Sequence, residues 1–215
     1  MNIIGSEVKM LWILDAGHGI ETPGKRSPGK KTWDDGKTGI VEYEFNRDIV
    51  RRVSLALESM GIDTHVICQD EHTMSIADRK AIARTMIQEW DGDAAFISVH
   101  SNASGRGWNE NARGVTVFTE MNPERKSKQL AEIMVREISV ESSLANRGTR
   151  DCLWRNDKKV NVGNISKLPC PAVLTENGFM TSKFDCSILA SEAGRIAIAN
   201  GHVKAILRFQ EMMQK

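Results

Sequence analysis

The sequence predicts an α/β fold: a single domain with a mostly parallel, twisted sheet of about six strands and helices on both faces. Short apolar runs, typical of buried strands, alternate with segments whose apolar residues recur at the spacing of amphipathic helices. This alternation is the pattern of βαβ units, which build parallel sheets. The length of 215 residues suits one such domain, and no repeat or linker divides the sequence. We therefore expect residues 1–215 to form one domain.

In the first half of the chain, apolar runs predict strands at residues 11–15, 64–68 and 94–100. Regular apolar spacing predicts a helix from Glu42 to Gly61. A second helix is expected from Ser75, which forms a capping-box-like pair with Asp78, to about Trp90. Residues 20–39 are rich in Gly, Pro, Lys, Ser and Thr, which predicts a long loop of the kind that often carries function.

In the second half, strands are expected at residues 114–119, 151–154 and 172–176. Pro123 suits the first turn of a helix that would run to about Val140. A closing helix is expected from Ala190 to Met213, with Ile196 among the residues of its apolar side. With the first half, these elements complete the alternating pattern.

Composition and charge argue against several classes of protein. The chain is 40% hydrophobic and 27% charged, which is ordinary for a globular domain with a sizeable core. A net charge of +1 gives no field that would favour nucleic acid or an anionic membrane as a partner. No apolar run approaches the roughly 20 residues that span a bilayer. The apolar segment at residues 10–14 is too short for a signal-peptide core.

The four cysteines show no C-x-x-C spacing, and a chain of this length needs no disulfide to fold. We expect reduced thiols and no cysteine zinc site. The cysteines are Cys68, Cys152, Cys170 and Cys186.

Four polar residues follow the predicted strands or the loops that lead from them: His18, Glu42, His100 and Glu176. The carboxyl ends of parallel strands meet at one edge of the sheet, where α/β proteins bind ligands. Two histidines and a carboxylate form a plausible zinc shell with an open fourth position for water. The second carboxylate could then act as a general base. Each residue also has a structural alternative as a strand or helix cap, and spacing alone leaves both interpretations open.

His18 stands between Gly17 and Gly19, directly after the first predicted strand. Glycine gives backbone freedom and clears space beside the imidazole. We expect the two glycines to let His18 leave the strand and face a metal. The contexts of the other histidines are poorer, so we assign structural roles to His65, His72 and His202.

Taken together, these segments resemble the zinc-dependent N-acetylmuramoyl-L-alanine amidases of the amidase-3 type, over nearly the whole chain. The resemblance implies that His18, Glu42 and His100 bind one Zn²⁺ ion and that Glu176 is the catalytic glutamate. A helix turns about 100° per residue, so only one of Glu42 and Glu44 can face the metal. The E-x-x-x-N pattern of the family favours Glu42. The resemblance is carried by LDAGHG at 14–19, EYEFN at 42–46, RKAIAR from 79, FISVHSNA at 96–103 and PAVLTENGFMTS at 171–182.

The resemblance implies hydrolysis of the amide between N-acetylmuramic acid and L-alanine, with the glycan strand and stem peptide of peptidoglycan as the partner. Glu176 would take a proton from water and deliver it to the leaving amine. By position alone, Asn102, Asn109 and Arg113 are candidates for substrate contacts. Two alternatives are a zinc peptidase that cuts elsewhere on the stem peptide and a non-catalytic peptidoglycan-binding domain. The presence of Glu176 argues against the second.

The chain also departs from the family pattern. Lys30, Lys31 and Trp33 make the loop after His18 unusually basic, so substrate contacts there cannot be carried over. Between residues 119 and 147 there is room for one ordinary helix, whereas division-associated relatives insert an inhibitory helix. We therefore expect no activator protein. The sequence shows no signal peptide, although the expected substrate is the cell wall. We therefore expect either release of the protein by a phage or prophage lysis system, or a signal peptide that has been removed.

Overall fold

The structure, a computed structural model, describes residues 9–29, 39–155 and 158–214. The basic stretch at 30–33 lies outside the described residues. Six strands form one sheet in the order β2-β1-β3-β8-β4-β5. They are β1 (Met10–Ala16), β2 (Thr64–Ile67), β3 (Asp93–Asn102), β4 (Val115–Phe118), β5 (Asn146–Arg150) and β8 (Ala172–Phe179). The separate pair β6 (Leu153–Arg155) and β7 (Lys158–Val160) forms a small hairpin.

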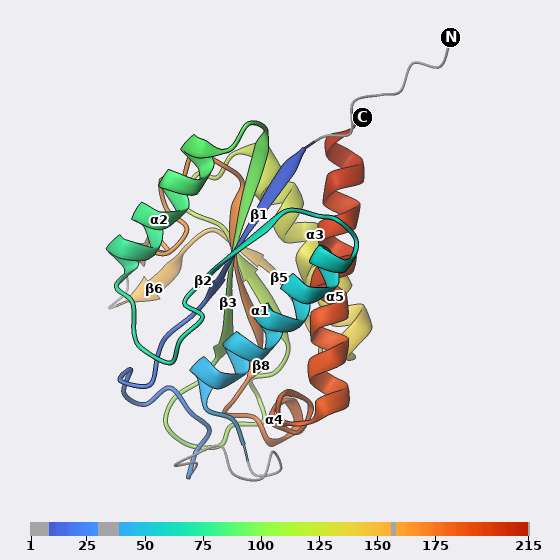
Figure 1. Cartoon of the computed structure of the whole chain (residues 1–215). Helices are drawn as coiled ribbons and strands as arrows, with labels where there is room; N and C mark the ends of the chain where they lie inside the picture. The colour runs from blue at the N-terminus through green and yellow to red at the C-terminus, as the bar shows by residue number, and fades with distance from the viewer. Residues whose placement is uncertain (1–8, 30–38, 156–157, 215) are drawn as a thin grey trace.

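The sheet is covered on both faces, which confirms the predicted fold class (Figure 1). Three helices lie on one face, where the middle one packs against each of the other two, and a single helix lies on the other face. The three are α1 (Glu42–Ser59), α3 (Arg125–Ser142) and α5 (Glu192–Met213), the single helix is α2 (Ile76–Glu89), and the short α4 (Lys183–Ala190) precedes α5. In the part of the chain that the structure describes, no helix has the length and apolar character to cross a membrane.

Strand direction decides where the polar residues meet. β1 is parallel to β2 and β3, and β3 is parallel to β8, whereas β4 is antiparallel to β8. The carboxyl ends of β1, β3 and β8 therefore lie at one edge of the sheet. The register places Asp15 beside Ser98 and His100 beside Glu176.

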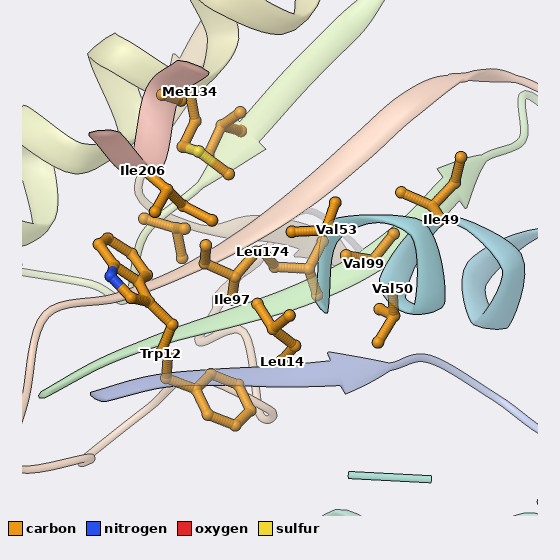
Figure 2. Close-up of a cluster of buried hydrophobic side chains, with 14 of the residues drawn as sticks. Trp12, Leu14, Ile49, Val50, Val53, Ile97, Val99, Met134, Leu174 and Ile206 are labelled. Atoms are coloured by element: carbon orange, nitrogen blue, oxygen red, sulfur yellow. The ribbon is translucent and has the colours of Figure 1, made fainter. Parts of the chain in front are cut away.

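The core lies between the sheet and the three-helix face. Trp12 of β1 meets Phe209 of α5 edge to face, with ring centroids 5.9 Å apart. Figure 2 shows Leu14, Val53 and Ile206 in the same apolar cluster, which joins β1, α1 and α5. Burial of these large side chains is the main force that holds the helices on this face.

The second half of the chain differs from the prediction in detail. The strand expected at 151–154 overlaps β6, which belongs to the separate hairpin, and the edge strand of the main sheet is β5. The sequence of β5, NRGTR, is polar and largely exposed, so no apolar run marks it. The closing helix expected from Ala190 to Met213 is confirmed as α5, which begins at Glu192 after Ser191, whose side chain accepts a hydrogen bond from the backbone of Gly194. The short helix α4 that precedes it was not predicted. Ile196, placed on the apolar side, is 44% exposed.

His202 lies buried in α5, as the structural role assigned to it requires. Its Nδ1 lies 2.9 Å from the carbonyl oxygen of Ile198, and its Nε2 lies 3.1 Å from the hydroxyl of Thr175. A carbonyl only accepts, so Nδ1 donates and Nε2 accepts from the hydroxyl. Burial lowers the pKa of His202 to about 4. The folded protein therefore holds this ring neutral.

We expect the free energy of unfolding to fall as the pH drops from 6.5 towards 4, by up to about 1.4 kcal/mol per pH unit from this residue. In this window the unfolded chain binds a proton at His202, whereas the folded protein does not. Urea unfolding at pH 7.5 and pH 5 measures the effect. The loss on acidification should be smaller in His202→Leu than in the unaltered chain, and equal losses would contradict the prediction.

Candidate metal centre

Three side chains from separate elements converge at the carboxyl edge of the sheet. His18 comes from the loop after β1, Glu42 begins α1, and His100 lies near the end of β3. Glu42 Oε1 is 3.3 Å from His18 Nε2 and 3.2 Å from His100 Nδ1. One ligand atom from each residue lies within 4.8 Å of the others, and within the described ranges this is the one such group. The structure therefore brings together all three predicted ligands.

The chemistry of this donor set fits a divalent cation. Two imidazole nitrogens and one carboxylate oxygen are typical of zinc sites that keep a position open. Glu42 is 1% exposed, and its Oε2 accepts no hydrogen bond from the described residues. Burial favours a higher pKa for Glu42, but hydrogen bonds from His100 and His18 outweigh it and hold the pKa below its usual value. Burial lowers the pKa of His18, which favours the neutral ring that a metal binds.

Glu42, rather than Glu44, faces the two histidines. Glu44 Oε1 instead accepts a hydrogen bond from the hydroxyl of Tyr43 at 3.2 Å. Asn46, one turn beyond Glu42, donates from its amide to the carbonyl oxygen of Gly17 at 3.0 Å. The E-x-x-x-N pattern therefore joins the start of α1 to the loop that holds His18.

The two glycines beside His18 provide space for neighbouring groups. The residue with an unusual, left-handed backbone conformation is His18 itself. His18 has a φ of 63°, in the left-handed region, whereas the glycines are not among the residues with positive φ. A Cβ atom at Gly17 would lie 2.2 Å from the ring of His100. At Gly19 it would lie 2.3 Å from the backbone nitrogen of Thr73. Of the two roles expected for the glycines, backbone freedom is not used, whereas cleared space is: both glycines permit close approach.

Buried charges hold the backbone of this loop. Arg79 of α2 donates from Nη1 to Asp15 Oδ1 at 2.6 Å and to the carbonyl oxygen of Ala16 at 2.8 Å. Its Nη2 donates to the carbonyl oxygen of His18 at 3.2 Å, and Arg47 donates to the same oxygen at 3.1 Å. Asp15 and Arg79 are both buried. In the sequence, the segment from Arg79 is a family motif without a predicted role, and the structure shows that its arginine holds this loop.

The far side of the His100 ring is also held. Its Nε2 lies 3.1 Å from the hydroxyl of Ser98, which donates to Asp15 Oδ2 at 2.6 Å. The amide nitrogen of Asn164 lies 3.3 Å from both groups. Because the hydroxyl proton goes to Asp15, Ser98 accepts from Nε2–H. Without a metal, Nδ1 of protonated His100 donates to Glu42 Oε1, and loss of that proton leaves the Nδ1 lone pair available to a metal. Sequence reasoning missed these roles of Ser98 and Asn164, and no local pattern marks Asn164.

Glu176 lies beside this cluster on β8, at the register position next to His100. Its Oε2 is buried and accepts no hydrogen bond from the described residues. Burial raises the pKa of Glu176 to about 7; the charge of His100 opposes this shift, and that of Glu42 adds to it. A carboxyl group that titrates near neutral pH is suited to accept and return a proton.

Of the three candidates for substrate contacts, Asn102 ends β3, and Asn109 and Arg113 lie in the loop that follows. Asn102 Oδ1 accepts from the backbone of Ala103, and Asn109 Oδ1 accepts from the backbone of Asn111. The guanidinium of Arg113 lies 4.6 Å over the ring of Phe184. The structure places none of the three in the metal-ligand cluster, so their contact with substrate remains a prediction.

Comparisons with known proteins extend over nearly the whole chain. The family described as Amidase_3, N-acetylmuramoyl-L-alanine amidase, matches residues 13–208. The endolysin of Bacillus phage SPP1 is 26% identical over 96% of this chain and 68% of its own length. A probable cell wall amidase LytH of Staphylococcus epidermidis is 25% identical over 92% of this chain but 57% of its own length, so the chain spans little more than half of that relative.

The fold is shared with solved structures. An N-acetylmuramoyl-L-alanine amidase from Clostridium difficile 630 superposes with a TM-score of 0.75 and 23% identity, covering 96% of this chain and 98% of that one. At this identity, the likeness establishes the α/β architecture, including the mostly parallel sheet.

Replacing Arg79 by Met should lower the free energy of unfolding by about 3–5 kcal/mol, because Asp15 would stay buried without its cation. Arg84→Met is the matched control on the same helix: Arg84 is exposed and donates to the backbone carbonyl of Lys167. Urea unfolding of both variants measures the difference. Equal losses of unfolding free energy in the two variants would show that the buried Asp15–Arg79 pair contributes no more to stability than the exposed Arg84 does.

Proposed function

The chain belongs to the Amidase_3 family of N-acetylmuramoyl-L-alanine amidases, and on this premise we propose that it hydrolyses the amide between N-acetylmuramic acid and the L-alanine of the peptidoglycan stem peptide, with one Zn²⁺ ion. The observation that carries the proposal is the meeting of His18, Glu42 and His100 with Glu176 at the adjacent register position. We propose that the first three hold the metal and that residues 1–215 act as one catalytic domain.

The bound zinc would lower the pKa of a water molecule and polarise the carbonyl group of the amide. Glu176 takes the proton of the attacking water on its carboxylate and then gives it to the leaving nitrogen of L-alanine. Its raised pKa suits both transfers, since the group must be a base in the first step and an acid in the second. The left-handed backbone of His18 and the buried contacts of His100 orient the two imidazoles without substrate.

The two alternatives differ from this proposal in observable ways. A zinc peptidase would release fragments cut within the stem peptide, and a binding domain would release none. Glu176 supports catalysis, because binding of the polymer alone does not need a half-buried carboxyl group with a pKa near 7. Independence from an activator is also part of the proposal, since α3 is the one helix between β4 and β5.

The test is digestion of purified peptidoglycan by the chain after chelation, with and without added Zn²⁺, with the fragments identified by mass spectrometry. We expect free stem peptides that begin with L-alanine, and only with zinc. Glu176→Gln should lose activity by about 10²–10⁴-fold while it still binds zinc, because it removes the proton acceptor. Glu44→Gln is the matched control and should keep both properties.

Three outcomes would count against parts of this assignment. Fragments cut elsewhere on the stem would indicate the peptidase, and zinc binding without fragments from any wall type would indicate a binding domain. Full activity in Glu176→Gln would remove this residue from the mechanism.

The contact behind His100 gives a separate prediction. Ser98→Ala removes the acceptor of His100 Nε2–H and should weaken zinc binding by about 10–100-fold. Ser139→Ala is the control, since the hydroxyl of Ser139 is buried on α3 and has no hydrogen-bond partner among the described residues. Competition with a chelating dye measures both affinities. Equal affinities in the two variants would show that Ser98 does not hold the ligand.

A further inference from the structure

The two oxygens of Glu42 have different surroundings. Oε1 faces the nitrogens of His18 and His100, at 3.3 and 3.2 Å. Oε2 lies 3.6 Å from Nζ of Lys25 and accepts no hydrogen bond from the described residues. The lysine side chain is 39% exposed, whereas that of Glu42 is 1% exposed. Lys25 therefore approaches the buried carboxylate from the solvent side. It faces Oε2, whereas the histidines face Oε1.

The backbone holds Lys25 in this place. Its carbonyl oxygen accepts a hydrogen bond from the backbone nitrogen of Glu42 at 2.9 Å. Two residues later, the nitrogen of Ser27 donates to the carbonyl of Ile40 at 2.9 Å, and the hydroxyl of Ser27 accepts from the nitrogen of Ile40 at 3.0 Å. A Cβ at Gly39 would lie 2.5 Å from Cβ of Ser27, so glycine is needed for this close approach. The segment with Lys25 is thus attached to the residues that begin α1.

A carboxylate can bind a divalent ion through one oxygen or through both. Binding through both would place Oε2 of Glu42 in a coordination position that a hydrolytic zinc site must keep open. A cation next to Oε2 competes with the metal for that oxygen, and the attraction is strong because Glu42 is shielded from water. Among the described residues, Lys25 is the one lysine or arginine in ion-pair contact with Glu42.

We propose that Lys25 is a positioning residue that holds Oε2 of Glu42 away from the metal, so that Glu42 binds the ion through Oε1 alone and a coordination position stays open. This inference rests on the metal site of the proposed function. It gives Lys25 a role at the metal site, in a loop for which the family resemblance predicted no substrate contacts. A different role, direct contact of Lys25 with the substrate carbonyl, is separated by the experiment below.

The experiment loads the full chain with Co²⁺ and records the visible absorption spectrum, which reports coordination number because tetrahedral Co²⁺ absorbs more strongly than five- or six-coordinate Co²⁺. Lys25→Met removes the cation and keeps the length of the side chain, and Lys25→Arg keeps the cation. Lys204→Met is the control: it removes an ion pair with Glu141 from an exposed lysine on α5. Zinc affinity and the kcat and KM of digestion are measured on the same proteins.

We expect the visible absorption of Lys25→Met to fall by about two-fold or more, with zinc affinity changed by about ten-fold. Its kcat should fall more than its KM changes, because the open position is lost. Lys25→Arg and Lys204→Met should match the unaltered chain in the spectrum and the affinity.

A Lys25→Met variant with an unchanged spectrum and affinity would overturn the proposal, and a lower kcat in that same variant would assign Lys25 to the substrate instead. Failure of the unaltered chain to bind Co²⁺ or Zn²⁺ would overturn both this proposal and the metal site. If the spectra change as expected but the unaltered chain releases no stem peptides, the proposed reaction falls while the role of Lys25 stands.

Discussion

The arrangement of the site depends on one buried carboxylate, that of Asp15 at the end of β1. It is inaccessible to solvent, pairs with Arg79 of α2 and accepts a hydrogen bond from Ser98 of β3. A charge at this depth is tolerated only when its oxygens are paired. One partner, Arg79, comes from α2, the single helix on its face of the sheet, and the other, Ser98, comes from the neighbouring strand β3. Their pairing therefore sets where the chain turns out of the sheet, and so where His18 lies.

Each proposed ligand is also held on the side that faces away from the metal. The carbonyl oxygen of His18 accepts from two guanidinium groups, and the outer nitrogen of His100 is bound to Ser98. Lys25 lies at the outer oxygen of Glu42. Contacts of this kind orient metal ligands and tune their affinity. The three ligand atoms consequently face one point without an ion, which lowers the cost of ordering them when one binds.

The position of Glu176 follows from the direction of the strands. Because β3 and β8 are parallel and in register, Glu176 lies next to His100 at the carboxyl edge of the sheet. Negative charge therefore accumulates there, and burial together with Glu42 raises the pKa of Glu176 to about 7. The same accumulation makes the edge favourable for a divalent cation. The parallel pairing of β3 and β8 thus places both the proposed metal site and the proposed proton acceptor at the same edge of the sheet.

The sequence by itself predicted the fold class, because apolar periodicity is a local signal, and it singled out His18, Glu42 and His100 through their positions after strands and loops together with the family resemblance. It did not reveal β5, which is polar, or the role of Asn164, a single loop residue without a pattern. Only the tertiary structure decided which oxygen of Glu42 faces the histidines and which groups hold the ligands from behind. Those contacts join segments far apart in the chain, so their geometry arises only when the sheet and its helices pack.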